Sequence, residues 1–209
     1  MKTLEDQLSA AGLVVVGCCQ RLSQHDGDLM QTSPLLQDMT PEEADILGQA
    51  MLLVRVAPGQ VLIKEGESGD WMLLILSGTV DVSKKIPRLA PAAASTPTQA
   101  PEDPVPADGD VAELPAPPTS SRVAVLQRGA AVGEMSMLDN EPRYASCTAI
   151  EAVDAGVLGR RAIALLIRDH PSVGAKLLVK ITQLMAQRLR NTGNQLVKLL
   201  HPQTPDQDH

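Results

Sequence analysis

The fold is decided by residues 62–78, which read LIKEGESGDWMLLILSG. Two strand-like runs, 61–64 and 71–76, lie on either side of a short segment that contains Gly66 and Gly69. Glycine adopts the backbone angles of tight turns at low cost, so this segment favours a chain reversal. Ser77 and Gly78 then end the second run at a further turn. The stretch therefore predicts two short strands joined by a tight reversal.

Further short strands surround this pair. The strand-like runs are 52–56, 79–84, 122–127, 146–150 and 153–158, and several of them end at glycine or proline. No helix alternates with the strands, so a doubly wound parallel sheet is not indicated. The pattern predicts a mainly β sandwich or barrel with flanking helices.

Helices are predicted on both sides of the strands. Thr40, Pro41 and Glu43 combine an N-cap, a proline at the first helical position and a capping-box glutamate. Two helices, 160–169 and 172–200, follow the last strand, and a weaker helix is expected around Leu4, Leu8 and Val15. One stripe of the longest helix contains Leu178, Ile181, Met185, Leu189, Thr192, Leu196 and Leu199. Its second half extends beyond a small domain, which favours pairing with a second copy over packing on its own sandwich.

Residues 86–121 interrupt the predicted sheet. They hold nine of the 16 prolines and little apolar surface, so we expect a disordered Pro/Ala-rich insertion. A proline-rich docking site is the alternative. The flanking runs 79–84 and 122–127 alternate apolar and polar residues, which predicts a hairpin whose strands still pair across the insertion.

Composition excludes several classes of function. The 209 residues carry a net charge of −7 and include one Trp, one Tyr and no Phe, so base-stacking surfaces for nucleic acid are disfavoured. Cys18, Cys19 and Cys147 form neither a CxxC pair nor an even disulfide framework. The apolar run 13–16 is too short to span a bilayer. We therefore expect an aliphatic core and a cytoplasmic protein with no membrane insertion.

A second stretch, residues 132–146, reads VGEMSMLDNEPRYAS and carries groups suited to a sugar phosphate. Gly133 and Glu134 precede a short helical turn, and Arg143 leads into the next strand. Arg143 offers a bidentate fork to a phosphate, and Glu134 can accept a hydrogen bond from a sugar hydroxyl. Backbone N–H groups at the helical turn also favour negative charge. The alternative is that Glu134 and Arg143 pair with each other.

These two stretches resemble the cyclic nucleotide-binding domain family of the catabolite activator and protein kinase A regulatory subunit type. The resemblance covers about residues 34–200 apart from the insertion, and the second stretch matches the family's phosphate-binding cassette. It implies an eight-stranded antiparallel jelly roll, a cassette helix near residues 135–138 and two closing helices, B and C. The implied ligand is cAMP or cGMP, with cAMP first, and no other cofactor is expected.

The resemblance also implies roles for individual residues. Glu134 would hold the ribose 2′-hydroxyl, Arg143 the cyclic phosphate, and Thr192 the base. The implied ligand-binding residues are Gly133, Glu134, Met135, Ser136, Arg143, Tyr144, Ala145 and Thr192. Tyr144 stands where the family prefers a small residue, and its ring can narrow the pocket, stack on a base or point away. A hydroxyl at this position often sets the preference between cAMP and cGMP.

The sequence thus predicts four regions. These are an N-terminal helical extension (1–33), the jelly roll (34–160), C-terminal lid and dimerisation helices (161–201) and a tail (202–209). We expect a stand-alone sensor that binds no DNA, dimerises through residues 172–200 and signals to an unknown effector protein by movement of the C-terminal helix. His25, His170, His201 and His209 lie outside the predicted strands, so a cupin-type metal enzyme, or any enzyme, is disfavoured. A ligand-free interaction scaffold and a cyclic dinucleotide sensor remain alternatives.

Overall fold

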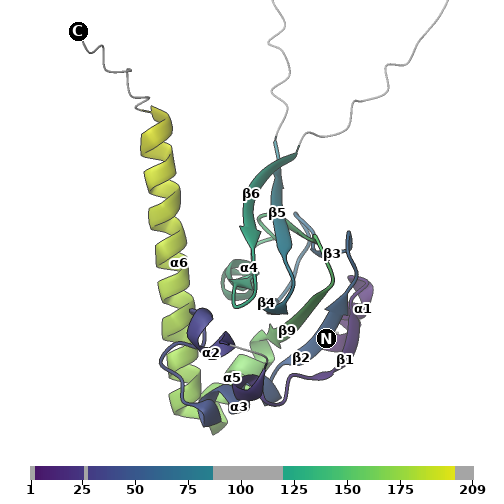
Figure 1. Cartoon of the computed structure of the whole chain (residues 1–209), viewed down its shortest axis with the longest axis vertical. Coiled ribbons are helices and arrows are strands. Elements are labelled where there is room, and N and C mark those ends of the chain that lie inside the picture. The colour runs from purple at the N-terminus through teal and green to yellow at the C-terminus, as the bar shows by residue number, and fades with distance from the viewer. Residues whose placement is uncertain (1–2, 26–27, 87–119, 201–209) are drawn as a thin grey trace, which may run out of the picture.

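The computed structural model describes residues 3–25, 28–86 and 120–200. Within these residues, nine strands form two antiparallel sheets with helices beside them (Figure 1). The strands are β1 (Val14–Cys18), β2 (Leu52–Val56), β3 (Val61–Ile63), β4 (Trp71–Ser77), β5 (Val80–Lys85), β6 (Ser120–Leu126), β7 (Ala131–Val132), β8 (Ser146–Ala149) and β9 (Val153–Gly159). One sheet has the order β1-β2-β9-β4-β7 and the other β3-β8-β5-β6. The predicted mainly β fold is confirmed.

The helices lie before, within and after the strands. They are α1 (Leu4–Ala10), the 3₁₀ turn η1 (Leu22–Gln24), α2 (Leu29–Thr32), α3 (Pro41–Gln49), α4 (Glu134–Asp139), α5 (Arg160–Asp169) and α6 (Pro171–Leu200). The predicted capping box is present at α3, because the Thr40 hydroxyl accepts from Glu43 N and the Glu43 carboxylate accepts from Thr40 N. Pro171 begins α6, one residue before the predicted start, since its missing N–H is not needed there.

The N-terminal region agrees with the predicted helix at Leu4 and Leu8, which lie in α1, but not at Val15. Val15 lies in β1, which pairs antiparallel with β2 so that Val15 faces Val54. Three consecutive β-branched residues, Val14 to Val16, favour extended backbone, and the open edge of β2 supplies hydrogen bonds that a lone helix would lack. The eight strands of the expected jelly roll correspond to β2–β9, and β1 adds a ninth.

The strands on either side of the insertion form the predicted hairpin. β5 pairs antiparallel with β6, from Val80 opposite Leu126 to Lys85 opposite Ser120. The expected disorder of the insertion concerns residues outside the described ones, apart from Ile86 and the first two residues of β6. The pairing joins the two halves of the sequence in one sheet.

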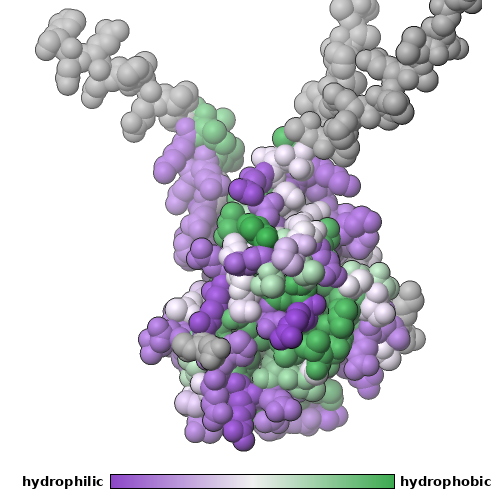
Figure 2. All heavy atoms as spheres, turned by 45° about the vertical axis from the view of Figure 1, so that its right-hand side comes forward, coloured by the Kyte–Doolittle hydropathy of each residue, from purple (hydrophilic) through white to green (hydrophobic). Residues whose placement is uncertain are grey.

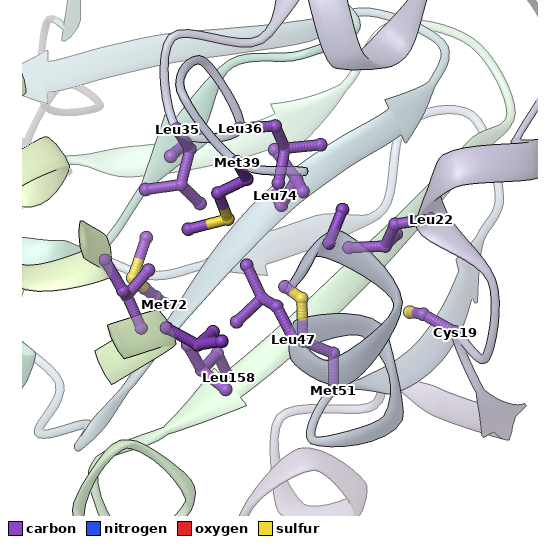
Figure 3. Packing of buried hydrophobic residues seen from close by; sticks show 14 of the residues in the cluster. Cys19, Leu22, Leu35, Leu36, Met39, Leu47, Met51, Met72, Leu74 and Leu158 are labelled. Carbon is purple, nitrogen blue, oxygen red and sulfur yellow. The ribbon is translucent and has the colours of Figure 1, made fainter. Parts of the chain in front are cut away.

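The core consists of two aliphatic layers, and β4 contributes to both. Met72, Leu74 and Leu76 point to the layer under the helices, whereas Trp71, Leu73 and Ile75 point to the layer between the sheets. This is the period-two alternation of a strand that is buried on both faces. Figure 3 shows part of the helix-side layer, in which Leu47 and Met51 pack near Leu158, and Leu35, Leu36 and Met39 lie near Leu74.

The two halves of α6 have different surroundings. Val173, Leu177 and Ile181 in the first half are buried in the helix-side layer, whereas most of the second half is exposed. Figure 1 shows α6 running along one side of the molecule, past α5 and α4. In the part of the chain that the structure describes, no helix combines the length and apolarity needed to cross a bilayer.

Candidate functional site

A buried carboxylate marks the start of α4. Gly133 adopts φ 88°, a left-handed conformation that glycine tolerates, and so lets the chain turn sharply from β7 into the helix. Glu134 is 1% exposed, Ser136 is also buried, and Met135 lies at the surface. The short helix therefore places Glu134 and Ser136 inside the site and Met135 at its outer side.

Glu134 has one partner and one unpaired oxygen. Arg188 of α6 donates from Nη1 to Glu134 Oε1 and from Nη2 to the carbonyl oxygen of Ala131. Glu134 Oε2 is buried and accepts no hydrogen bond from the described residues. A buried acceptor without a donor costs about 1–3 kcal/mol, and more when it is charged. The site thus presents an oxygen that a hydroxyl donor would satisfy.

Arg143 lies in the loop after α4 and is 4% exposed. Its Nη1 donates to the carbonyl oxygen of Gly133 at 2.7 Å, and its Nη2 donates to the carbonyl oxygen of Trp71 at 2.7 Å. The guanidinium carbon lies 4.4 Å from the centre of the Trp71 ring. Among the described residues, no carboxylate forms an ion pair with Arg143.

The charge of Arg143 persists despite this burial. Desolvation lowers the pKa of the guanidinium from its ordinary value, while the carboxylates of Asp70 and Glu134 act in the opposite direction. Because the ordinary pKa of a guanidinium lies far above neutral pH, the side chain stays protonated. The loop therefore holds a buried positive charge that forms no ion pair with a carboxylate in the described part of the chain.

Two glycines make room for this guanidinium. A Cβ atom on Gly69 would lie 2.4 Å from Arg143 Nη2, and one on Gly133 would lie 2.7 Å from Nη1. Gly66, at φ 84°, is the residue that the chain reversal itself requires. The sequence indicated Gly69 as part of a tight turn, whereas the structure shows that it leaves space for Arg143.

Tyr144 turns its side chain toward β5. The ring is 59% exposed, and Lys84 Nζ lies 3.7 Å from its centre. The same ammonium donates to the carbonyl oxygen of Tyr144 at 2.7 Å and to Glu65 Oε1 at 3.4 Å. Of the three orientations considered from the sequence, the structure shows a ring that lies against the β5 hairpin. Ala145, the next residue, is half-buried against the layer between the sheets.

The structure brings seven of the eight predicted site residues together, and it pairs Glu134 with a residue that was not predicted. Gly133, Glu134, Met135, Ser136, Arg143, Tyr144 and Ala145 all lie in the α4 segment and the loop that follows it. The alternative pairing of Glu134 with Arg143 is wrong, because Glu134 pairs with Arg188 instead. Thr192 is exposed on α6, one helical turn after Arg188.

Sequence reasoning missed Arg188 and the role of Trp71. Arg188 lies in the stretch 187–193 that contains Thr192, four residues before it, so helical spacing could have placed both on one face. Nothing local in the sequence indicates that Trp71 contacts Arg143, which lies 72 residues later.

The described residues give no sign of a metal site. No group of three or more His, Cys, Asp or Glu side chains within residues 3–25, 28–86 and 120–200 is arranged to hold an ion. His25 and His170 both lie outside the strands, as expected from the sequence. The Cys147 thiol is buried, which raises its pKa to about 12, so it is protonated at neutral pH.

Comparison with known proteins agrees with this geometry. Residues 115–170 match the family model of the cyclic nucleotide-binding domain. A cyclic nucleotide-binding domain from Methylobacillus flagellatus has a similar structure, with 28% identity, a TM-score of 0.67 and coverage of 94% of this chain and 92% of that one. The chain is therefore similar to the cyclic nucleotide-binding domain family in both sequence and fold. The Thermus thermophilus catabolite activator protein is also similar, with 25% identity, a TM-score of 0.60 and coverage of 80% of this chain and 63% of that one.

Curated relatives are similar over most of the domain but are longer proteins. A cAMP-dependent protein kinase regulatory subunit of Yarrowia lipolytica is 29% identical over 155 residues, which is 74% of this chain and 32% of that protein. A CRP-like cAMP-activated global transcriptional regulator of Mycobacterium tuberculosis is 25% identical over 178 residues, which is 85% of this chain and 65% of that protein. This chain therefore spans less than two thirds of the length of either relative.

Proposed function

We propose that this domain binds a cyclic nucleotide, with cAMP as the ligand, and acts as a non-enzymatic sensor. The unpaired Oε2 of Glu134 carries this proposal. It is a buried carboxylate oxygen in the family's cassette, and it accepts no hydrogen bond from the described residues. A ribose 2′-hydroxyl would donate to it and remove the cost of leaving it unpaired.

Arg143 supplies the second half of the recognition. Its two Nη groups are oriented by neutral carbonyl oxygens, so its charge remains available to an anion. A sugar phosphate carries a hydroxyl donor and an anion in one molecule, which matches the acceptor of Glu134 and the charge of Arg143. The names of both relatives described above refer to cAMP, and this supports cAMP over cGMP as the first ligand to test.

Titration calorimetry with cAMP, cGMP and cyclic dinucleotides tests this function. Trp71 gives a second signal, because it is the single tryptophan of the chain and contacts Arg143, so its fluorescence should change when phosphate binds. We expect Arg143→Ala to weaken cAMP binding at least about 100-fold, because the variant loses two charge-assisted hydrogen bonds to the phosphate. The matched control is Arg122→Ala, which removes an exposed arginine paired with Asp81 outside the cassette.

The alternatives predict different results. Heat and fluorescence signals with cyclic dinucleotides alone would favour a dinucleotide sensor. Silence with every nucleotide would overturn the sensor and favour an interaction scaffold. Normal cAMP binding by a folded Arg143→Ala variant would show that the phosphate assignment is wrong.

We further propose that α6 transmits the signal and forms a homodimer. Arg188 links α6 directly to the carboxylate that would receive the ribose, so a ligand on Glu134 changes the surroundings of this helix. Leu189 and Leu196, seven residues apart, are 75% and 55% exposed, which is the spacing of a helix pair. Figure 2 shows hydrophobic residues gathered at the C-terminal end of α6. The partner that reads this movement would be a protein in the cytoplasm, where the free thiols of Cys18, Cys19 and Cys147 are stable.

Light scattering on the full chain tests the dimer. We expect twice the chain mass for the wild type and a single chain mass for Leu189→Glu with Leu196→Glu. Lys198→Glu, an exposed change between the leucines of the stripe, should leave the dimer intact. A monomeric wild type at high concentration would contradict the proposal.

A further inference from the structure

We propose that Trp71 is a positioning residue of the phosphate site, whose indole ring holds the Arg143 guanidinium in its binding orientation without neutralising its charge. This inference rests on the proposed function and names a determinant of the same site. It concerns one aromatic residue at the start of β4, in a chain with a single Trp, a single Tyr and no Phe.

Trp71 contacts Arg143 in two ways. The carbonyl oxygen of Trp71 accepts from Arg143 Nη2 at 2.7 Å, and the ring centre lies 4.4 Å from the guanidinium carbon. A cation within about 6 Å of an indole face is attracted by the ring's quadrupole, and burial strengthens the attraction. Trp71 and Arg143 are both buried, so this contact is shielded from water.

The ring is itself fixed in place. Its side chain belongs to the apolar layer between the sheets, which also contains Ile63 and Leu73. Gly69 lies so close to the guanidinium that a Cβ there would displace it. The guanidinium therefore lies between a packed ring on β4 and the glycine-rich turn before it, and its two Nη groups point to carbonyl oxygens.

The partners of Arg143 are neutral, and this matters for anion binding. A carboxylate contact would orient the guanidinium but would also cancel the charge that a phosphate needs. Neither nearby carboxylate forms an ion pair with Arg143 among the described residues. Glu134 pairs with Arg188 instead, and Asp70 raises the pKa of Arg143 only through its charge. The ring and the two carbonyl oxygens give orientation and leave the positive charge for the ligand.

The proposal predicts that the π face, not merely the apolar volume, is required. Trp71→Leu keeps an apolar side chain in the core but removes the ring, which frees Arg143 to turn toward Asp70 or Glu134. Trp71→Phe keeps an aromatic face and serves as the conservative rescue. We expect Trp71→Leu to weaken cAMP binding about tenfold, within the range of a buried cation–π contact. Trp71→Phe should stay within about threefold of the wild type.

Calorimetry on the variants measures the affinity for cAMP and, separately, the affinity for adenosine, which lacks the phosphate. Trp71→Leu should lower the affinity for cAMP and leave the affinity for adenosine unchanged, whereas general damage to the fold would lower both affinities. Equal cAMP binding by Trp71→Leu and wild type would overturn the inference. So would equal losses in the Leu and Phe variants, because volume and not the π face would then matter.

A ligand-free measurement separates this inference from the proposed function. In ¹⁵N-edited NMR, the Nε–H signal of Arg143 can be assigned by its loss in Arg143→Lys. The ring current of Trp71 should move the proton chemical shift of this signal away from that of an exposed arginine. This ring-current shift should persist in Trp71→Phe and vanish in Trp71→Leu. If no nucleotide binds the wild type, the proposed function fails, and the NMR signal still decides the orientation. An undisplaced signal in the wild type overturns the inference even if cAMP binds and even if Trp71→Leu does not fold.

Discussion

Arg188 of α6 forms an ion pair with Glu134, the first residue of α4, across 54 positions of sequence. The second Nη group of Arg188 donates to the carbonyl oxygen of Ala131 in β7. One side chain thus connects the long C-terminal helix to the carboxylate and to the strand that leads into it. Under the proposed function, a ligand hydroxyl on Glu134 would share that carboxylate with Arg188, and this would couple occupancy of the site to the position of α6.

Removal of Arg188 should show, in the free energy of unfolding, how strongly its side chain interacts with Glu134. Arg188→Leu leaves the buried Glu134 carboxylate without a partner, and we expect a loss of about 1–3 kcal/mol. Glu134→Gln removes the charge, so Arg188→Leu should cost clearly less in that background. A double-mutant cycle measured by urea denaturation gives the difference. Arg190→Leu, which removes an exposed arginine that donates to Gln187 on its own helix, is the control. Strictly additive losses would show that the two side chains are not coupled.

Gly69→Ala should weaken ligand binding with little loss of stability. The new Cβ would lie 2.4 Å from Arg143 Nη2, and the flexible guanidinium can move away while the backbone stays. We expect cAMP affinity to fall about tenfold by calorimetry, because the arginine leaves its orientation. Gly193→Ala is the matched control, since nothing lies within 4 Å of its Cβ position on α6. That variant should gain up to about 1 kcal/mol of helix stability and bind cAMP normally. Unchanged affinity in Gly69→Ala would mean that the observed position of Arg143 is not the binding position.

Patterns that are local in the sequence predicted local structure well. The capping box at Thr40 and Glu43 fixed the start of α3, and alternation identified β5 and β6 although an insertion separates them. These features depend on residues a few positions apart or on a period of two, both of which a sequence displays directly.

Features that depend on distant partners were not predictable in this way. β1 exists because its valines meet the open edge of β2, and β7 has only two residues, Ala131 and Val132, too few to show a period. The contact of Arg188 with Glu134 and the contact of Arg143 with Trp71 join segments that only the folded sheet brings together. The sequence therefore identified the residues of the cassette but not the residues that they contact.

Tyr144→Ser should change nucleotide preference more than phosphate affinity. The ring lies over Lys84 and is largely exposed, so its loss leaves the backbone N–H of the cassette loop in place. A small hydroxyl becomes available at the position where the resemblance to cyclic nucleotide-binding domains implies that a hydroxyl distinguishes the bases. We expect cAMP affinity to stay within about threefold and the cGMP-to-cAMP ratio of affinities to rise. Competition calorimetry measures the ratio, and Tyr144→Phe, which keeps the ring over Lys84, should match the wild type. An unchanged ratio in the serine variant would contradict a role for this position in selectivity.

Glu43 connects the first turn of α3 to α6. Its carboxylate accepts from Lys176 Nζ at 2.6 Å, from Thr40 N at 2.9 Å and from Ser172 Oγ at 3.0 Å. These hydrogen bonds, with the one from Lys176 the largest cause, lower the pKa of Glu43 from 4.5 to about 2. The charged form of this group is therefore favoured in the folded protein relative to the unfolded chain.

This pKa shift predicts a window of pH in which the contact between α3 and α6 is lost. Because the pKa of Glu43 is lower in the folded state, its contribution is complete above the unfolded value of 4.5 and disappears as pH falls toward 2. In urea denaturation, the wild type should be more stable than Glu43→Gln by a constant margin above about pH 5, and the margin should shrink below it. Glu42→Gln, which removes a neighbouring charge in the same turn of α3, is the matched control, because Glu42 takes no part in the hydrogen bonds that Glu43 accepts. A margin that is as large at pH 2.5 as at pH 6 would exclude ionisation of Glu43 as its source, because the protonated acid could not sustain the ion pair with Lys176.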